Sequence, residues 1–225
     1  MRFDTTHTKM KTKILLTALA LTGLVTFRAQ AQITVSTVAS NGLAEPFGVV
    51  FDADSHLYIS DGANNRIVKI DAATQGLSTL AGIPEDAPGS DDGFAYLAHF
   101  NNPQGMILVN YNGVDGLLVA DYGNHLIRFV RLSDGYVTTV AGQVSGGPAV
   151  DAAGTGATFR YPVGLSQGTN GNVYIADFGN NAIRVMNLND SNLGVTNIAI
   201  SGTTLFGERN FAAAVKRLRK AVEAS

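Results

Sequence analysis

One short motif occurs three times in this chain, with about 60 residues between copies. Each copy ends in an aspartate, which is followed by a turn and then by a second apolar run. The copies are Tyr58-Ile-Ser-Asp61, Leu118-Val-Ala-Asp121 and Tyr174-Ile-Ala-Asp177, and the runs after the turns are 64–69, 124–128 and 180–184. A repeat of this length, built from short apolar runs and Gly/Asn turns, predicts an array of four-stranded blades.

Aligning the copies predicts four strands in each of three blades. The expected strands are 47–51, 57–60, 66–70 and 77–80 in the first blade, 105–109, 117–120, 126–131 and 136–140 in the second, and 163–166, 173–176, 182–186 and 195–200 in the third. A Pro-x-Gly step precedes the first strand of every blade, at Pro46, Pro103 and Pro162. Proline cannot donate to a strand ladder, so it suits the start of a strand, and glycine permits close approach at a crowded axis.

These motifs keep one order over about 160 residues, and in that order they resemble the NHL-repeat β-propellers, in particular secreted bacterial NHL repeat-containing proteins. The resemblance implies an all-β propeller that serves as an interaction platform. Residues 33–39 read like one more fourth strand, because Ser36-Thr-Val-Ala39 is similar to Ser78-Thr-Leu-Ala81. No matching set of three strands follows Gly202, and propellers need about four to eight blades. We therefore expect an incomplete ring over 32–202, with three blades and an orphan N-terminal strand.

The segment 203–225 departs from the repeat. Asn210 is a helix-capping residue, and Phe211, Val215, Leu218 and Val222 follow it at helical spacing, which predicts a short amphipathic C-terminal helix with a basic face. Three interpretations remain open: a helix that covers an open blade edge, a truncated or altered reading frame, and a helix that docks on a membrane surface or a partner.

Residues 1–31 have the features of a signal peptide. Four basic residues precede an apolar run at 14–27, and Ala29-Gln-Ala31 supplies a cleavage site, so the mature chain is expected to begin at Gln32. The run is shorter than the roughly 20 residues of a membrane span. The sequence therefore predicts an exported protein, periplasmic or extracellular, that is not integral to the membrane; a buried core helix is the alternative.

Composition excludes several classes of function. The chain has no cysteine, so disulfides and a thiol nucleophile are excluded. Residues 32–202 hold 6 Lys/Arg against 15 Asp/Glu, while 203–225 hold 5 against 2. An acidic body argues against nucleic acid as a partner, because phosphate binding requires clustered Lys and Arg.

The loops on one face of the propeller are the expected binding surface. Strands alternate in direction within a blade, so the turns between second and third strands share a face with the connections between blades. These loops are acidic and display two aromatic rings from neighbouring blades. The expected ligand-binding residues are Tyr122, Phe178, Asp91, Asp92 and Asp151. Packing of the two rings on adjacent loops is the alternative.

Residues that recur in every blade are expected to serve the blade. Aspartate and asparagine bond nearby backbone N–H groups in turns, so we interpret six recurring residues as structural. These are Asp61, Asp121, Asp177, Asn64, Asn124 and Asn180. Arg128 and Arg184 are also equivalent, with Val68 in the first blade, and both arginines are expected to pair with carboxylates.

The sequence offers little support for catalysis or a metal. His56, His99 and His125 fall at different places in the repeat, so we expect no zinc site, and no Gly-x-Ser-x-Gly nucleophile motif occurs. Asp52, Asp54 and the pair at 91–92 leave calcium as an open alternative. We expect no cofactor, and the apolar residues at the starts of the first strands argue against an active site at the axis.

The leading interpretation is therefore a non-catalytic scaffold that binds a protein, peptide or glycan through its acidic loop face. A propeller-fold lyase or hydrolase is the competing class. A fragment without independent function, able to self-associate through open blade edges, is the third interpretation.

Overall fold

The computed structural model describes residues 36–39, 41–83, 87–190 and 193–198. The chain divides into two compact units, Met1–Val38 and Ala39–Ser225, and every strand among the described residues belongs to the second. The expected signal peptide and the C-terminal helix lie outside the described residues, as does most of the orphan strand. Within the described part, no helix is long and apolar enough to cross a membrane.

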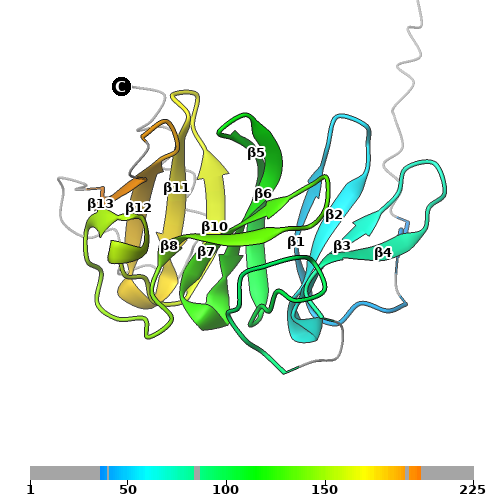
Figure 1. Cartoon of the computed structure of the whole chain (residues 1–225), viewed down its shortest axis with the longest axis horizontal. Helices are drawn as coiled ribbons and strands as arrows, with labels where there is room; N and C mark the ends of the chain where they lie inside the picture. Colours follow the sequence, from blue (N-terminus) through cyan, green and yellow to red (C-terminus); the bar gives the residue numbers. More distant parts are fainter. Residues whose placement is uncertain (1–35, 40, 84–86, 191–192, 199–225) are drawn as a thin grey trace, which may run out of the picture. The chain divides into compact units, whose positions relative to one another are not determined.

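The described part is all-β, as the repeat predicts, with three antiparallel sheets and only 3₁₀ turns as helical structure. Blade 1 comprises β1 (Pro46–Phe51), β2 (Leu57–Asp61), β3 (Arg66–Ile70) and β4 (Leu77–Ala81). Blade 2 comprises β5 (Pro103–Tyr111), β6 (Val114–Asp121), β7 (Leu126–Arg131) and β8 (Val137–Gly142). Blade 3 comprises β10 (Pro162–Gln167), β11 (Asn172–Asp177), β12 (Ala182–Asn187) and β13 (Gly194–Asn197), with β9 (Ala152–Ala153) added beside β13. Figure 1 shows blade 2 between blades 1 and 3.

The β5–β6 hairpin is longer than the sequence predicts. Asn112 and Gly113 both have positive φ, 53° and 80°, which is the backbone of the two-residue hairpin turn that Asn-Gly favours. The turn continues the ladder to Tyr111↔Val114. By contrast, residues 36–39 form no strand, although the sequence predicts one over 33–39. A strand needs a ladder partner, and none of the described residues pairs with them.

The Pro-x-Gly step marks the same irregularity in every blade. The proline at the start of each first strand (Pro46, Pro103 or Pro162) pairs with the repeated aspartate of its blade. The register of the ladder then shifts between this proline and the residue three positions later. A bulge at this point suits proline, which has no N–H for the ladder. The first strands of neighbouring blades approach closely here, because a Cβ at Gly105 would lie 2.3 Å from the Val163 carbonyl oxygen.

The hydrophobic core lies in layers between the blades. One cluster, centred on Tyr58, Leu117 and Val130, fills the joint between blades 1 and 2. A second, centred on Phe129 and Ile175, fills the joint between blades 2 and 3. β6 and β7 of blade 2 contribute to both joints, since alternate residues of a strand point to opposite faces.

Candidate binding surface

Each second strand ends in an aspartate that is fully buried and holds one loop to another. Asp121 accepts hydrogen bonds from the Asn101 N–H, the Asn124 amide and the Arg128 guanidinium, all at 2.8 Å. Asp177 has the same three kinds of donor, at 2.7, 2.9 and 3.3 Å, in Arg160, Asn180 and Arg184. In blade 1 the donors to Asp61 are Ala44, Asn64 and Arg66. The connection that leads into each blade is thereby fixed on the turn between that blade's second and third strands.

Arg128 and Arg184 are fully buried and extend these networks to the connections 82–102 and 143–161. Nη2 of Arg128 donates to Asp92 Oδ1 at 2.8 Å, and Nη2 of Arg184 donates to Asp151 Oδ1 at 2.9 Å. Each guanidinium also bonds two loop carbonyls and lies over a buried phenylalanine ring, 5.3 Å from Phe100 or 5.2 Å from Phe159. The ion pairs expected from the sequence for these arginines are confirmed.

Burial changes the acidity of the buried carboxylate in blade 2. Complete burial raises the pKa of Asp121 to about 6, against the opposing pull of Arg128 and the hydrogen bonds that Asp121 accepts. A buried carboxylate with this many donors belongs to a structural network and has no free surface for a ligand.

The acidic residues expected to bind ligand have different surroundings. Asp92 uses both oxygens internally, because it also accepts from the Thr139 N–H and hydroxyl at 2.9 Å. Asp151 pairs with Arg184, and its side chain keeps 45% exposure. Asp91 is the most accessible of the three, with 75% of its side chain exposed and Oδ2 lying 3.1 Å from Nδ1 of His99. Asp92 and Asp151 thus take the same internal role in two blades.

The two aromatic residues expected to bind ligand also differ. Tyr122 is partly buried because its ring packs on Tyr161 from the next blade, with centroids 4.9 Å apart. Phe178 stands at the equivalent position of blade 3 and is 62% exposed. Their role in ligand binding stays a prediction.

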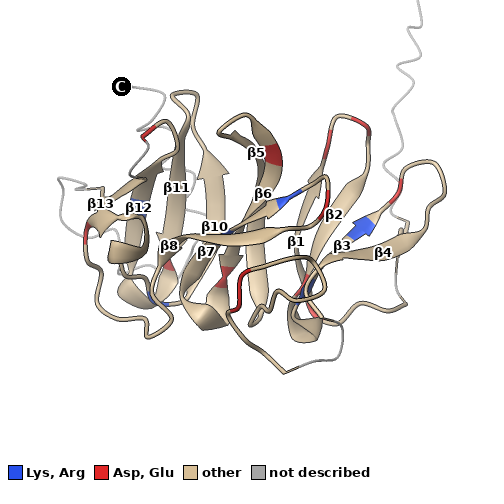
Figure 2. Ribbon diagram, in the orientation of Figure 1, with Lys and Arg blue, Asp and Glu red and all other residues tan. Residues whose placement is uncertain are grey.

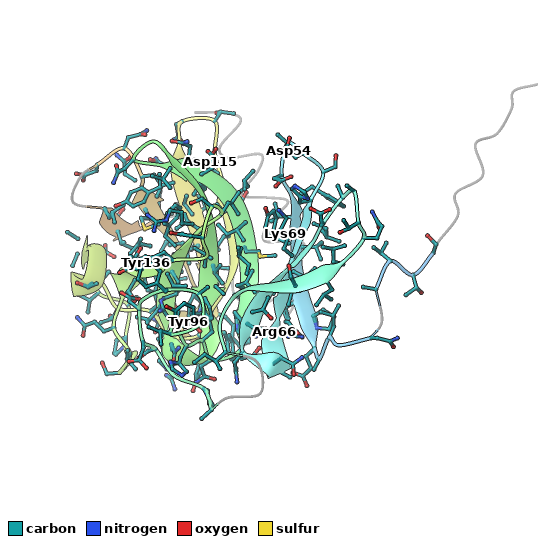
Figure 3. All side chains as sticks on the ribbon, turned by 45° about the vertical axis from the view of Figure 1, so that its right-hand side comes forward. Asp54, Arg66, Lys69, Tyr96, Asp115 and Tyr136 are labelled. Atoms are coloured by element: carbon teal, nitrogen blue, oxygen red, sulfur yellow. The ribbon has the colours of Figure 1, made fainter. Side chains whose placement is uncertain are left out.

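A second aromatic group lies at the outer edge of blade 2, and the sequence reasoning missed it. We call Phe94, Tyr96, Leu97 and Tyr136 the outer-rim cluster. The rings of Phe94 and Tyr96 are nearly parallel at 6.3 Å, and Tyr136 meets Phe94 edge-on at 5.1 Å. Phe94, Tyr96 and Leu97 are 51%, 71% and 52% exposed, and Figure 3 shows Tyr96 and Tyr136 on neighbouring segments. The available signal was aromatic residues in a predicted loop, three residues after Asp91.

The backbone holds the outer-rim cluster firmly. Gly93 and Val137 exchange two backbone hydrogen bonds, at 3.0 and 2.8 Å, which adds the connection to the edge of β8. Arg131 lies 5.2 Å from the Tyr136 ring centre and pairs with Asp134. The hydrogen bond from Arg131 lowers the pKa of Asp134 and raises that of Arg131. Both residues are therefore charged beside the ring at neutral pH.

Acidic residues in Figure 2 lie mostly on loops and strand ends, and the described part shows few basic ones. Its three histidines serve separate local contacts, at Asp71 for His56, at Asp91 for His99 and at the Tyr161 N–H for His125. No group of three or more His, Asp or Glu side chains suited to a metal ion occurs among the described residues. Asp52, a calcium candidate, accepts bonds from two N–H groups and from the Tyr58 hydroxyl.

Known proteins contain the repeat that the blades of this chain show. The family model for the NHL repeat matches residues 159–186, which run from the end of the connection into blade 3 to β12. Asp177 and Arg184 lie inside this match, and their equivalents Asp121 and Arg128 occur in blade 2. The chain therefore contains an NHL repeat.

Relatives share this repeat over part of their length. The chain is 28% identical to bovine NHL repeat-containing protein 2 over 74% of this chain and 25% of the relative. It is 37% identical to the chloroplastic protein SUPPRESSOR OF QUENCHING 1 of Arabidopsis thaliana over 41% of this chain and 8% of that protein. The NHL-repeat chain thus spans a quarter or less of these curated relatives.

A solved structure shows the same fold. An auxiliary nutrient binding protein from Bacteroides ovatus superposes with a TM-score of 0.54 at 20% identity, covering 66% of this chain and 36% of that one. At this identity the likeness establishes the propeller-type arrangement of the blades alone.

Proposed function

We propose that this NHL-repeat chain is an exported, non-catalytic binding module that holds a glycan on the connection between blades 1 and 2. The outer-rim cluster carries the proposal. Three large apolar side chains that are more than half exposed stand together on a backbone fixed by the Gly93–Val137 bridge. Clustered, rigid aromatic residues at a surface are typical of contact sites.

The chemistry around the cluster favours a glycan among the ligands expected for the acidic loop face. Sugar rings present C–H groups that pack on aromatic faces, while their hydroxyls donate to carboxylates. Asp91 supplies an accessible carboxylate from the same connection, three residues before Phe94. The structural neighbour from Bacteroides ovatus is described as a nutrient-binding protein, and a binding role of that general kind is part of what we propose for this chain.

Export is the second part of the proposal, and it rests on the sequence of residues 1–31 alone. Expression of the full chain in a bacterial host, followed by mass spectrometry of the periplasmic and culture fractions, tests it. The expected product begins at Gln32. Recovery of the uncleaved chain from the cytoplasm would contradict export without affecting the binding proposal.

Affinity electrophoresis in gels that contain xylan, laminarin or glycogen tests the binding proposal. We expect at least one polysaccharide to retard the chain, and Tyr96→Ala to weaken that retention about fivefold to tenfold, the effect of losing one aromatic contact. Phe178→Ala is the matched control, because it deletes a similarly exposed ring on another blade and leaves the outer-rim cluster intact.

Each other outcome assigns the surface differently. A loss in Phe178→Ala equal to that in Tyr96→Ala would extend the site across the acidic loop face to blade 3 and would contradict a site confined to the outer-rim cluster and Asp91. Retention of peptides from a tryptic mixture, with no retention by the three polysaccharides, would make the ligand a peptide. Turnover of a retained polysaccharide would contradict the non-catalytic role.

A further inference from the structure

The two joints between described blades contain the same kind of hydrogen bond. In blades 2 and 3, the residue before the first-strand proline has positive φ and donates its N–H to a side chain of the preceding blade. Asn102 N–H donates to Asn65 Oδ1 at 2.9 Å, and Tyr161 N–H donates to His125 Nδ1 at 3.0 Å. Both acceptors are the left-handed residues that end a 3₁₀ turn. The joint therefore has a donor half on one blade and an acceptor half on the other.

The joints also share a contact beside this hydrogen bond. The first residue of the 3₁₀ turn lies against the same pre-proline residue of the next blade. The ring of Tyr122 packs on that of Tyr161 at a tilt of 33°, and a Cβ at Gly62 would lie 2.8 Å from the Asn102 side chain. Two adjacent contacts thus define how one blade docks on the next.

Blade 3 presents the acceptor half of such a joint, and no described residue occupies it. Asn181 has the left-handed backbone of Asn65 and His125, and its exposed side chain bonds to no described residue. Phe178, the equivalent of Tyr122, is 62% exposed. Tyr174, Ile183 and Val185 lie half-buried on the sheet face that points away from blade 2.

Blade 1 presents the donor half. Glu45 precedes Pro46 with φ of 50°, as Asn102 and Tyr161 precede their prolines, and no described residue accepts from its N–H. On β1, Phe47 and Val49 are 56% and 64% exposed, whereas the equivalent Gln104 and Met106 of β5 are 8% and 7% exposed. Gln104 and Met106 are buried because the preceding blade packs against β5.

The uncovered part of blade 1 is limited to its inner strand. Ala39 and Leu43 pack over Ile59 and Val68, so the outer part of this face is already covered by the chain itself. The joint that remains to be made resembles the inner contact of β1 with β5, where first strands of neighbouring blades meet.

We propose that two copies of this chain associate head to tail, with blade 3 of each copy docked on β1 of the other. A head-to-tail contact closes into a ring when the rotation it imposes returns to the start. Two copies supply six blades, within the range of about four to eight over which propellers close. A second copy is the occupant that carries both missing halves, the Glu45 N–H for Asn181 and a surface for Phe178.

Light scattering behind size exclusion tests the stoichiometry at micromolar concentration. The expected mass is twice that of one copy. Val49→Asp places a carboxylate in both proposed joints, and we expect it to halve the mass while the circular dichroism spectrum stays unchanged, because Val49 is exposed in a single copy. Leu97→Asp is the matched control: it is similarly exposed but belongs to the outer-rim cluster, and it keeps the double mass.

Crosslinking tests the head-to-tail orientation, and the natural absence of cysteine makes it clean. Glu45→Cys and Phe178→Cys are prepared as separate proteins and treated with a short bismaleimide. The expected crosslink forms in their mixture and in neither protein alone. A monomeric parent chain, an open series of larger species, or crosslinking within either single variant would each overturn the proposal.

Discussion

Blade 1 and blades 2 and 3 neutralise the same buried aspartate in different ways. In blades 2 and 3 the arginine comes from the middle of the third strand, at 128 and 184, and a second carboxylate from the preceding connection completes the pair. In blade 1 that position is Val68, and Arg66 reaches Asp61 with its Nε at 2.7 Å. The two positions lie two residues apart on one strand, so they share a face. The fold requires a positive charge at the aspartate but accepts it from either position.

The arginines of the two arrangements also hold different parts of the chain in place. Arg128 and Arg184 bind long connections, whereas Arg66 bonds Gly42 and Thr79 and holds a short approach to β1. We infer that the arginine of blades 2 and 3 contributes more to stability, because it orders more backbone.

The largest expected effect is the removal of a fully buried arginine. Arg128→Met leaves Asp121 buried without its counter-charge, and the loss in free energy of unfolding is expected to be about 3–5 kcal/mol. Arg66→Met is the comparison: it also leaves a fully buried aspartate unpaired, but Arg66 is 12% exposed and orders less backbone, so the loss should lie at the lower end of that range, about 3 kcal/mol. Urea unfolding followed by circular dichroism measures both. Equal losses would remove the distinction between the blades.

Blade 1 can be converted to the pattern of the other two. Val68→Arg combined with Arg66→Leu moves the charge to the position of Arg128, but the described approach to β1 has no acidic residue placed like Asp92. We expect the double variant to be about 2 kcal/mol less stable than the parent, because one face of a buried guanidinium stays unpaired. Parent-like stability in the same urea titration would mean that Asp61 alone satisfies an arginine at 68.

A smaller effect on stability is expected to distinguish Asp92 from its neighbour Asp91. Asp92→Asn removes the charge that faces Arg128 and is expected to cost about 1–2 kcal/mol, since one partner is buried and the other half-exposed. Asp91→Asn, whose side chain is 75% exposed, should leave the melting temperature unchanged and weaken polysaccharide retention. The reverse pattern would exchange the structural and ligand-binding assignments of this pair.

The smallest expected effect is a pH dependence of stability that arises at the joint between blades 2 and 3 and not at the joint between blades 1 and 2. Burial and the nearby Arg160 lower the pKa of His125 from its usual 6.5, and Nδ1 must be unprotonated to accept from Tyr161. Because the folded pKa is the lower one, this stabilisation is complete above pH 6.5 and is lost as pH falls through the folded pKa. The loss is expected to be about 0.5–1 kcal/mol, since His125 is partly exposed.

His125→Asn is the matched variant, because it reproduces the Asn65 acceptor of the other joint and asparagine tolerates the left-handed backbone. Melting temperatures between pH 7.5 and pH 5 should fall less in the variant than in the parent. An unchanged pH dependence would mean that another group titrates.

The candidate site was harder to predict than the fold. Asp91 was found as an acidic loop residue, but its neighbour Asp92 has the same sequence character and points into the Arg128 network. Tyr122 and Phe178 were identified as a pair, yet one packs on Tyr161 and the other is exposed. Phe94 and Tyr96 went unnoticed because they do not recur between blades.

The blades follow from the amino-acid sequence alone. Alternating apolar runs, Pro-x-Gly steps and the repeated Asp-x-x-Asn turns act over a few residues each, so strand order and the positions of Asp61, Asp121 and Asp177 follow from local chemistry. Packing of the folded chain settles which acidic side chains are used internally, which rings are covered, and that Arg66 takes the place left by Val68. Those outcomes depend on contacts between residues 5 to 47 positions apart in the chain, and no local pattern records them.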